Sequence, residues 1–524
     1  MLLPELLVTA AARTPEAPAL VTADGEWSYA RLAGLVACVA GGLRQQGLKP
    51  GERVAVWLDK RVETVAACFG SAAAGAAFVP LNPLLRAAQV GHILRDSGAA
   101  VLVTSPERAA LLGALWASLP DLRLRVLTGP FDSASDAAAL AWEALAGAAP
   151  AAGLVGGDSD MAAILYTSGS TGGPKGVVLS HRNLTVGAAS VAGYLGNRAD
   201  DTLLAVLPLS FDAGFSQLTT AFQVGARVVL LNYLLPRDVL KAIDSHHVTG
   251  LTAVPPLFIQ LAQTPAEPDS GHTLRYFANT GGRMPQATLQ ALRERWPQAQ
   301  PVLMYGLTEA FRSTWLPPEE VDRRPDSIGK AIPEAEVLVL REDGSECAAG
   351  EPGELVHCGP LVAQGYWQDA ERTAARFRPL PARLGSTELA VYSGDTVRRD
   401  EEGYLYFIGR RDEMIKTSGY RVSPTEIEEV LYASGLIGEC AVFGVEHPAL
   451  GQAIQVLVTA PAGRDAPDLS ALQAVCRAQL PAYMVPAGIA AISGPLLRNA
   501  NGKIDRRRLA DEWQAPDLYA PEST

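Results

Sequence analysis

Apolar runs of strand length alternate with alanine-rich amphipathic segments over most of this chain. Such runs lie at residues 53–58, 99–104, 202–207, 226–231 and 250–254. Segments 29–46 and 286–296 instead repeat their apolar residues with the period of a helix. Because parallel strands need helical crossovers between them, the alternation predicts an α/β fold built from βαβ units.

The pattern changes twice towards the end of the chain. From about residue 332, short apolar runs alternate with glycine and aspartate turns, which predicts a small β-rich subdomain. After residue 410, segments follow in the order helix, strand, strand, helix, at 425–432, 439–445, 453–459 and 469–479. We therefore expect a large N-terminal domain at 1–410, its β-rich subdomain at about 332–410, and a small mobile α+β domain at 411–524.

The composition excludes several classes of protein. With 48% hydrophobic and 19% charged residues, the chain can bury large cores, and global disorder is excluded. A net charge of −12 makes sequence-independent nucleic-acid binding a poor hypothesis. The six cysteines form no C-x-x-C pair, so we expect no disulfide scaffold, no zinc site and a cytoplasmic location.

Two segments bear on targeting and membranes. The N-terminal residues include Glu5 and no basic stretch, so no signal peptide is predicted. Residues 64–85 carry no charge, but two prolines interrupt them, and a helix followed by a strand and a turn explains them better than a membrane span. We expect no membrane insertion. The alanine- and glycine-rich residues 137–156 are expected to be a surface excursion.

The strongest local signal is the glycine-rich segment LYTSGSTGGPKGVV at residues 165–178. Its backbone N–H groups, hydroxyls and lysine suit a polyphosphate. The candidate phosphate-binding residues are Thr167, Ser168, Gly169, Ser170, Thr171, Gly172 and Lys175. A plain Gly/Ser linker is the alternative. A Walker A loop is disfavoured, because Pro174 and Gly176 stand where that loop needs Gly and Ser or Thr.

This segment resembles the signature of the adenylate-forming superfamily, which contains acyl-CoA synthetases, adenylation domains of nonribosomal peptide synthetases, and luciferases. The resemblance covers nearly the whole chain, through AFVPLNP at 77–83, YGLTE at 305–309, YSGD at 392–395, GRRD at 409–412 and NGKID at 501–505. Residues 310–329 resemble one bacterial subgroup, the stand-alone exosortase A-associated acyl-CoA ligases. No feature indicates the oxygen chemistry of a luciferase.

The resemblance implies a nucleotide site and a catalytic lysine. Tyr305 would stack on adenine, Thr308 would reach a phosphate, and Glu309 would hold Mg²⁺. Lys503 would bridge the substrate carboxylate and the α-phosphate of ATP. The other implied nucleotide-binding residues are Gly281, Gly282, Arg283, Gly306, Asp395 and Arg410.

The implied reaction has two halves. A carboxylate first attacks the α-phosphorus of ATP, and positioning plus positive charge must overcome the repulsion of two anions. The C-terminal domain then rotates at Asp412, so that Lys503 leaves and Gly419 enters beside the thiol tunnel. A thiol attacks the acyl adenylate to give a thioester. We expect CoA or a free carrier protein to supply it, because no phosphopantetheine-attachment motif is present and the sequence ends soon after Lys503.

The pair Phe211-Asp212 bears on which acid is activated. In amino-acid-activating members of the family, Asp at this position pairs with the substrate ammonium, and a buried carboxylate needs a partner. We therefore expect an amino acid substrate. In the alternative, Asp212 pairs with an internal cation, Arg283 or Arg312, and the substrate is a non-amino carboxylic acid. A non-catalytic nucleotide-binding or sensor protein is the alternative from another class.

Overall fold

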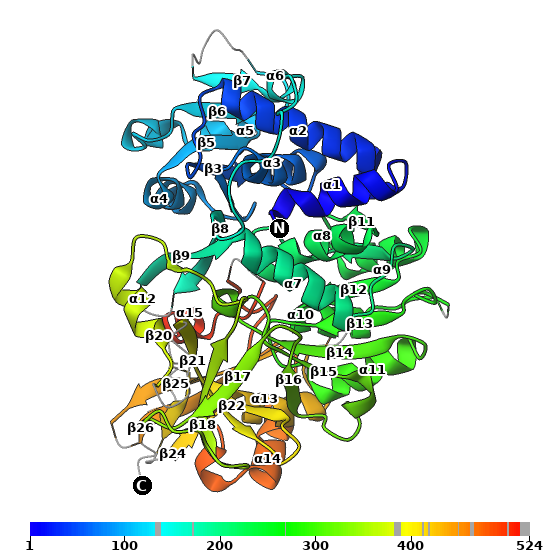
Figure 1. The fold of residues 1–524 in the computed structure, drawn as a ribbon. Coiled ribbons are helices and arrows are strands. Elements are labelled where there is room, and N and C mark those ends of the chain that lie inside the picture. The colour runs from blue at the N-terminus through cyan, green and yellow to red at the C-terminus, as the bar shows by residue number, and fades with distance from the viewer. Residues whose placement is uncertain are drawn as a thin grey trace.

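The computed structural model describes residues 1–131, 138–169, 172–267, 269–381, 389–410, 413–417, 420–448, 450–461, 466–499 and 502–513. These residues form three β-sheets with helices packed on their faces (Figure 1). The α/β class predicted from the sequence is confirmed, with a large N-terminal part and a small C-terminal one.

The first sheet contains the N-terminal βαβ units, in the order β19-β9-β8-β4-β3-β5-β6-β7. Its strands are β3 (Arg53–Trp57), β4 (Ala77–Pro80), β5 (Ala99–Thr104), β6 (Leu124–Leu127), β7 (Ala139–Ala141), β8 (Met161–Gly169), β9 (Gly172–Ser180) and β19 (Gly365–Tyr366). Its helices are α2 (Tyr29–Gln45), α3 (Val62–Ala73), α4 (Ala87–Ser97), α5 (Pro106–Leu111) and α6 (Trp142–Ala146). Strands β3 to β8 pair in parallel, whereas β9 joins β8 and β19 in antiparallel fashion.

The second sheet has the order β17-β18-β21-β22-β16-β15-β14-β13-β12-β10-β11-β1-β2, with β20 beside β21. Its parallel part comprises β1 (Pro18–Thr22), β10 (Thr202–Ala205), β11 (Arg227–Leu230), β12 (Gly250–Ala253), β13 (Tyr276–Asn279) and β14 (Gln300–Tyr305). Its antiparallel part comprises β2 (Gly25–Ser28), β15 (Thr314–Leu316), β16 (Ser327–Ala331), β17 (Glu336–Leu340), β18 (Pro352–Cys358), β20 (Phe377–Pro379), β21 (Leu389–Arg399) and β22 (Leu405–Arg410). The strands expected to form a β-rich subdomain thus continue the parallel sheet, through the pairing of β16 with β22.

The helices of this part are α1 (Leu3–Arg13), α7 (His181–Tyr194), α8 (Asp212–Val224), α9 (Pro236–Ser245), α10 (Pro255–Gln263), α11 (Gln286–Arg295) and α12 (Ala370–Arg376). Helix α8 meets α3 in an aromatic core. The ring of Phe215 on α8 lies 5.8 Å from that of Phe69 on α3 and 4.8 Å from that of Phe78. Burial of each such ring contributes about 1.5–3 kcal/mol. This core anchors α8, whose first residue is Asp212.

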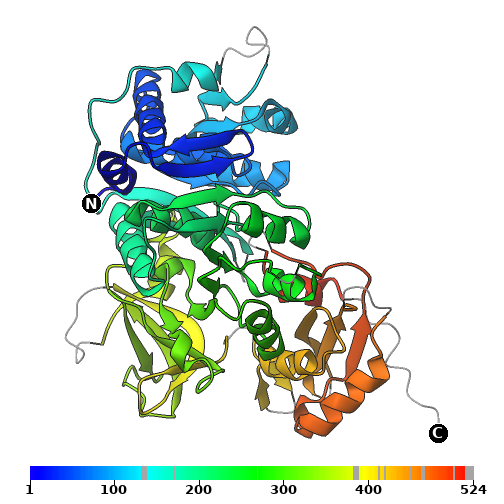
Figure 2. The same ribbon diagram turned by 90° about the vertical axis from the view of Figure 1, so that its right-hand side faces the viewer.

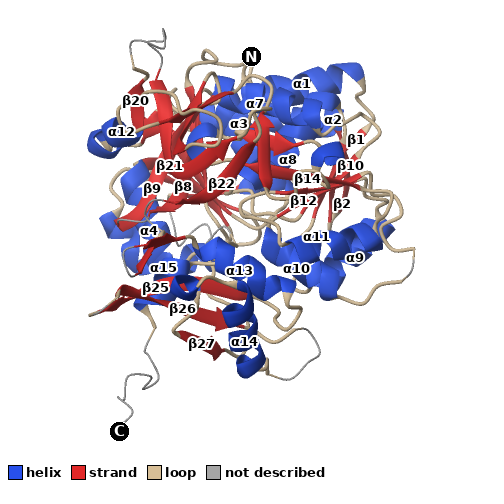
Figure 3. Ribbon diagram, turned by 90° about the horizontal axis from the view of Figure 1, so that it is seen from below, coloured by secondary structure: helices blue, strands red, loops and turns tan. Residues whose placement is uncertain are grey.

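The C-terminal residues form the third sheet, which lies at the lower right in Figure 2 and at the bottom in Figure 3. Its strands are β23 (Ile415–Thr417), β24 (Tyr420–Val422), β25 (Cys440–His447), β26 (Gly451–Val458) and β27 (Gly488–Ala491). Its helices are α13 (Pro424–Ala433), α14 (Leu469–Gln479) and α15 (Arg506–Asp511). The sheet meets the N-terminal part where α13 packs on α11, and the backbone N–H of Gln286 donates to Glu429 Oε1 at 3.1 Å.

The prediction that residues 137–156 form a surface excursion is wrong for the first half of this segment. Strand β7 pairs in parallel with β6, and α6 buries Trp142 and Leu145. Alanine is compatible with both a strand edge and a helix, so its abundance alone could not distinguish them. Within the described ranges, no helix is long and apolar enough to cross a membrane.

Candidate active site

The predicted phosphate-binding segment is a β-hairpin rather than a free loop. Strands β8 and β9 pair Thr167 with Lys175 and Gly169 with Gly172. Ser168 lies in β8 between two of these residues. Thr167 Oγ1 is buried and has no hydrogen-bond partner among the described residues, so the hairpin keeps a hydroxyl available for a ligand. Ser170 and Thr171, at its tip, lie outside the described residues.

Lys175 projects from this hairpin onto Glu309, which the sequence placed at the metal. The lysine Nζ lies 2.7 Å from Glu309 Oε1 and 2.8 Å from the hydroxyl oxygen of Tyr366. That hydroxyl donates to Glu309 Oε1 at 2.7 Å, which closes a triangle of three polar groups. Thr308, also buried, begins the short 3-10 turn that holds Glu309.

Glu309 is ionised at neutral pH. Burial opposes its ionisation, but the positive charges of Lys175 and Arg376, together with the hydrogen bonds from Lys175 and Tyr366, outweigh this effect and lower its pKa to about 2. A single buried carboxylate beside the lysine that is predicted to bind phosphate suits Mg²⁺, which prefers one or two protein carboxylates plus substrate phosphates. The part of the chain that is described contains no cluster of three metal-ligating side chains.

A second cluster of polar side chains is centred on Asp395. The hydroxyl of Tyr305 donates to Asp395 Oδ2, and Arg410 Nε donates to Asp395 Oδ1 at 2.8 Å. Asp395 raises the pKa of Arg410, so the guanidinium is firmly charged. The Tyr305 ring lies nearly parallel to that of His357, with centroids 6.2 Å apart. Two of the residues expected around the nucleoside, Tyr305 and Asp395, are therefore in direct contact.

Lys503 reaches this site from the C-terminal domain. Its turn is held by Asn499, whose side chain accepts from the Lys503 N–H at 3.1 Å. The ammonium lies 5.4 Å from the centroid of the Phe211 ring. Burial lowers the pKa of Lys503, and the negative charge of Asp212 partly counters this. Lys503 and Phe211, expected at one site, are thus brought together.

The loop after β13 provides the space for this lysine. Gly281 has φ of 78°, and a Cβ there would stand 2.8 Å from Lys503 Cε. The backbone conformation therefore favours glycine at this position, and a side chain there would displace the end of Lys503. Gly282 follows in the same loop and accepts from Asn279 Nδ2 through its carbonyl. Arg283 forms ion pairs with Asp326 and Glu429, and so links the loop to α13.

Asp212 is paired inside the protein. Arg312 NH1 lies 3.2 Å from Asp212 Oδ2, and both side chains are only 3% exposed. Of the two internal cations weighed for this role, the structure selects Arg312, whereas Arg283 is engaged elsewhere. Burial raises the pKa of Asp212, while Arg312 and Lys503 oppose the rise. Gly306, after β14, lets the backbone of Arg312 pass, since a Cβ there would stand 3.0 Å from its Cα.

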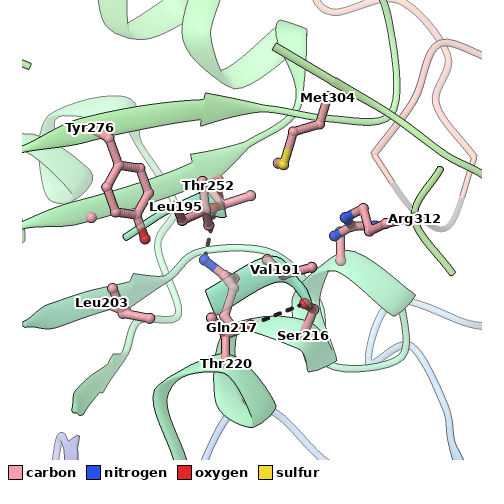
Figure 4. A pocket seen from close by; sticks show the side chains of 12 residues that line it. Val191, Leu195, Leu203, Ser216, Gln217, Thr220, Thr252, Tyr276, Met304 and Arg312 are labelled. Carbon is pink, nitrogen blue, oxygen red and sulfur yellow. Dashed lines mark hydrogen bonds between the residues drawn. The ribbon is translucent and has the colours of Figure 1, made fainter. Parts of the chain in front are cut away.

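A cavity of about 10 Å³, room for one water, lies between α8 and strands β12 to β14. Arg312 stands at one end of it and Tyr276 with Leu203 at the other (Figure 4). Its walls are largely apolar, with hydroxyls of Ser216, Thr220 and Thr252 among them. These lining residues come from several elements, and apart from Arg312 none of them was predicted from the sequence.

Sequence reasoning also missed Tyr366 and Arg376, which act on Glu309. Each lies more than fifty residues from Glu309 in a stretch without any chemical motif, so only the fold brings them together. The expected hinge residue Asp412 and the expected tunnel residue Gly419 lie outside the described residues.

Comparison with known proteins places this arrangement in a family. Residues 7–367 match the family model described as AMP-binding enzyme, and residues 426–503 match the AMP-binding enzyme C-terminal domain. The chain belongs to the AMP-binding enzyme family. The hairpin of β8 and β9 and Glu309 lie in the first match, and Lys503 is the last residue of the second. This AMP-binding enzyme is an AMP-forming ligase that joins a carboxylic acid to a thiol.

Its relatives act on different acids. It is 33% identical to an L-proline--[L-prolyl-carrier protein] ligase of Streptomyces coelicolor, over 94% of this chain and 93% of that one. It is 32% identical to a feruloyl-CoA synthase of Amycolatopsis sp, over 92% of this chain and 93% of that one. It is also 29% identical to bacitracin synthase 3 of Bacillus licheniformis, in a match that covers 97% of this chain but only 8% of that protein.

Solved structures share the fold over nearly the full chain. ATP-bound MatB from Rhodopseudomonas palustris is 27% identical, with a TM-score of 0.85 over 98% of this chain and 99% of that one. The anthranilate CoA ligase AuaEII in complex with anthranoyl-AMP is 25% identical, with a TM-score of 0.87 over 98% of this chain and 97% of that one.

Proposed function

We propose that this ligase activates an α-amino acid with ATP and passes it to CoA or to the phosphopantetheine of a free carrier protein. The observation that supports an amino acid is the position of Asp212. Its carboxylate is buried and acts electrostatically on Lys503, the residue proposed to hold the reacting carboxylate. One oxygen, Oδ1, has no hydrogen-bond partner among the described residues and is free to accept from a substrate ammonium.

In the proposed first half-reaction, the residues position two anions that repel each other. Lys503 bridges the substrate carboxylate and the α-phosphate, while Thr167 and Lys175 hold the outer phosphates with the rest of the hairpin. Glu309 would hold Mg²⁺, which would supply positive charge to neutralise the departing pyrophosphate. Thr308 contacts a phosphate, Tyr305 stacks on adenine with Gly281, Gly282 and Arg283 at its edge, and Asp395 and Arg410 hold the ribose.

In the proposed second half-reaction, the C-terminal domain moves. Polar contacts join α13 to the N-terminal part, such as the bonds of Glu429 to Gln286 and Arg283. Such an interface can open at a modest cost. We place the domain boundary between residues 410 and 411 and the pivot at Asp412. Rotation would withdraw Lys503 and bring Gly419 to the thiol tunnel, so that one cavity serves both steps.

The test is pyrophosphate exchange over the standard amino acids and a matched panel of plain carboxylic acids, followed by thioester formation with CoA and with a carrier protein. We expect exchange with an amino acid that exceeds exchange with its deamino analogue. Turnover of plain acids with none of amino acids would overturn the amino acid proposal. No exchange with any acid would favour a non-catalytic nucleotide-binding protein.

A non-amino acid is the second candidate, and one observation favours it. Arg312 already neutralises Asp212, so a substrate ammonium is not needed to balance that carboxylate. The feruloyl-CoA synthase among the relatives acts on such an acid by its name. Comparing each amino acid with its deamino analogue separates the two candidates directly.

A further inference from the structure

The ion pair of Asp212 and Arg312 is buried, but two of its polar atoms lack hydrogen bonds in the part of the chain that is described. A single contact of 3.2 Å joins Arg312 NH1 to Asp212 Oδ2. Asp212 Oδ1 and Arg312 Nε are both buried without a partner among the described residues. Buried polar atoms in folded proteins are nearly always bonded, so one open acceptor beside one open donor requires an explanation.

A second ion pair in the same chain shows what a structural pair looks like. Arg275 donates two hydrogen bonds to Asp201, from Nε to Oδ1 at 2.8 Å and from NH2 to Oδ2 at 2.6 Å. Thr249 Oγ1 and the backbone N–H of Arg198 donate further hydrogen bonds to the same carboxylate. Every oxygen of Asp201 is bonded, in contrast to Asp212. The Asp212–Arg312 pair therefore has unused bonding capacity beside the cavity.

The backbone directs Arg312 to this position. Phe311, the residue before it, has φ of 56°, which is uncommon for a residue with a bulky side chain. The Phe311 ring is fully buried against Gly187 of α7, where any side chain would collide with it. This packing holds the turn, and the turn places Arg312 at the end of the cavity (Figure 4).

A carboxylate suits the open side of Arg312. The guanidinium has one bond to Asp212, of 3.2 Å, and its Nε is buried without a partner among the described residues. Hydrogen bonds between arginine and a carboxylate are charge-assisted and stronger than those to a neutral acceptor. A ligand that brings a carboxylate to this side of Arg312 therefore fits the pair better than an uncharged one.

We propose that Arg312 is a specificity-determining residue for an α-amino acid with an acidic side chain. This inference rests on the proposed function. The ammonium of the amino acid would donate to Asp212 Oδ1, its side-chain carboxylate would accept from Arg312, and its α-carboxylate would meet Lys503. Both open hydrogen-bonding atoms are then satisfied. A plain monocarboxylic acid leaves Asp212 Oδ1 without a donor.

The test measures pyrophosphate exchange with L-aspartate, L-glutamate, L-asparagine, L-alanine and succinate, the deamino analogue of aspartate. We expect aspartate or glutamate to exceed asparagine and alanine by at least about tenfold in kcat/KM, and succinate to be activated less well. In Arg312→Met this preference should disappear, mainly through KM for the acidic amino acid. Arg275→Met, which removes a guanidinium from the satisfied pair, should keep the preference.

The outcomes separate this inference from the proposed function. Faster exchange with alanine or other uncharged amino acids than with aspartate and glutamate overturns the inference and leaves the amino acid proposal intact. Exchange with plain acids alone overturns both. A preference for acidic amino acids that persists in Arg312→Met overturns the role of Arg312. If Arg312→Met does not fold, Arg312→Lys replaces it, and the comparison of acids on the unaltered enzyme still decides the substrate class.

Discussion

Removal of one hydroxyl, in Tyr366→Phe, tests the triangle formed by Lys175, Glu309 and Tyr366. The change deletes the bond to Glu309 at 2.7 Å and the bond from Lys175 at 2.8 Å. It keeps the ring, which packs edge-on against Phe377 at 5.4 Å, so the fold should be retained. If Lys175 turns to a phosphate as proposed, the Tyr366 hydroxyl still donates to Glu309.

The size of the effect follows from these contacts. A hydrogen bond to a charged group contributes about 1.5–3 kcal/mol, and each 1.36 kcal/mol is tenfold in rate. We therefore expect kcat/KM for ATP to fall roughly tenfold to hundredfold, and half-saturation with Mg²⁺ to require more metal. The pKa of Glu309 would rise from about 2 but stay far below neutral, so the rate should not change with pH near neutrality.

The assay is pyrophosphate exchange at varied ATP and Mg²⁺, with Tyr406→Phe as the matched control. The Tyr406 hydroxyl also lies between a cation and a carboxylate, at 3.0 Å from Arg324 NH1 and 3.1 Å from Asp400 Oδ2. This second triangle includes none of the proposed nucleotide-binding residues, so Tyr406→Phe should leave exchange unchanged. Equal effects of the two substitutions, or an unaltered Mg²⁺ requirement in Tyr366→Phe, would refute the reasoning.

Three further predictions follow from the geometry. Lys503→Ala should reduce adenylate formation by about a hundredfold or more while sparing thioester formation from a supplied acyl adenylate, and equal loss of both would contradict the division of labour. Gly281→Ala should reproduce that split in milder form, because its Cβ would stand 2.8 Å from Lys503 Cε, and a crystal structure would show the lysine displaced. Burial lowers the pKa of His181 to about 4 and of His357 to about 3, so both are neutral when folded. The unfolded chain binds more protons below about pH 6.5, so the free energy of unfolding should fall between pH 6.5 and 4, by on the order of 3 kcal/mol for each histidine. Urea titrations should show this loss, and replacing both histidines with glutamine should flatten it.

Much of the fold could be predicted because its determinants are local. The run at 99–104 and the periodic segment 286–296 correspond to β5 and α11, since strand and helix periods are properties of short stretches. The expected surface excursion failed at Trp142 because only the pairing of β7 with β6 shows that this segment extends the sheet.

The sequence by itself determined which residues the proposed site uses. The glycine-rich segment around Lys175 suits phosphate, and the motifs that contain Glu309 and Lys503 resemble those of the adenylate-forming superfamily. Only the tertiary structure decided what these groups face. Asp212 and Arg312 are separated by a hundred residues, and their pairing depends on how α8 meets the turn after β14. An ion pair of this kind is fixed by burial and distance, which no spacing along the chain encodes. The physical reason is that charge acts through space, whereas motifs are read along the chain.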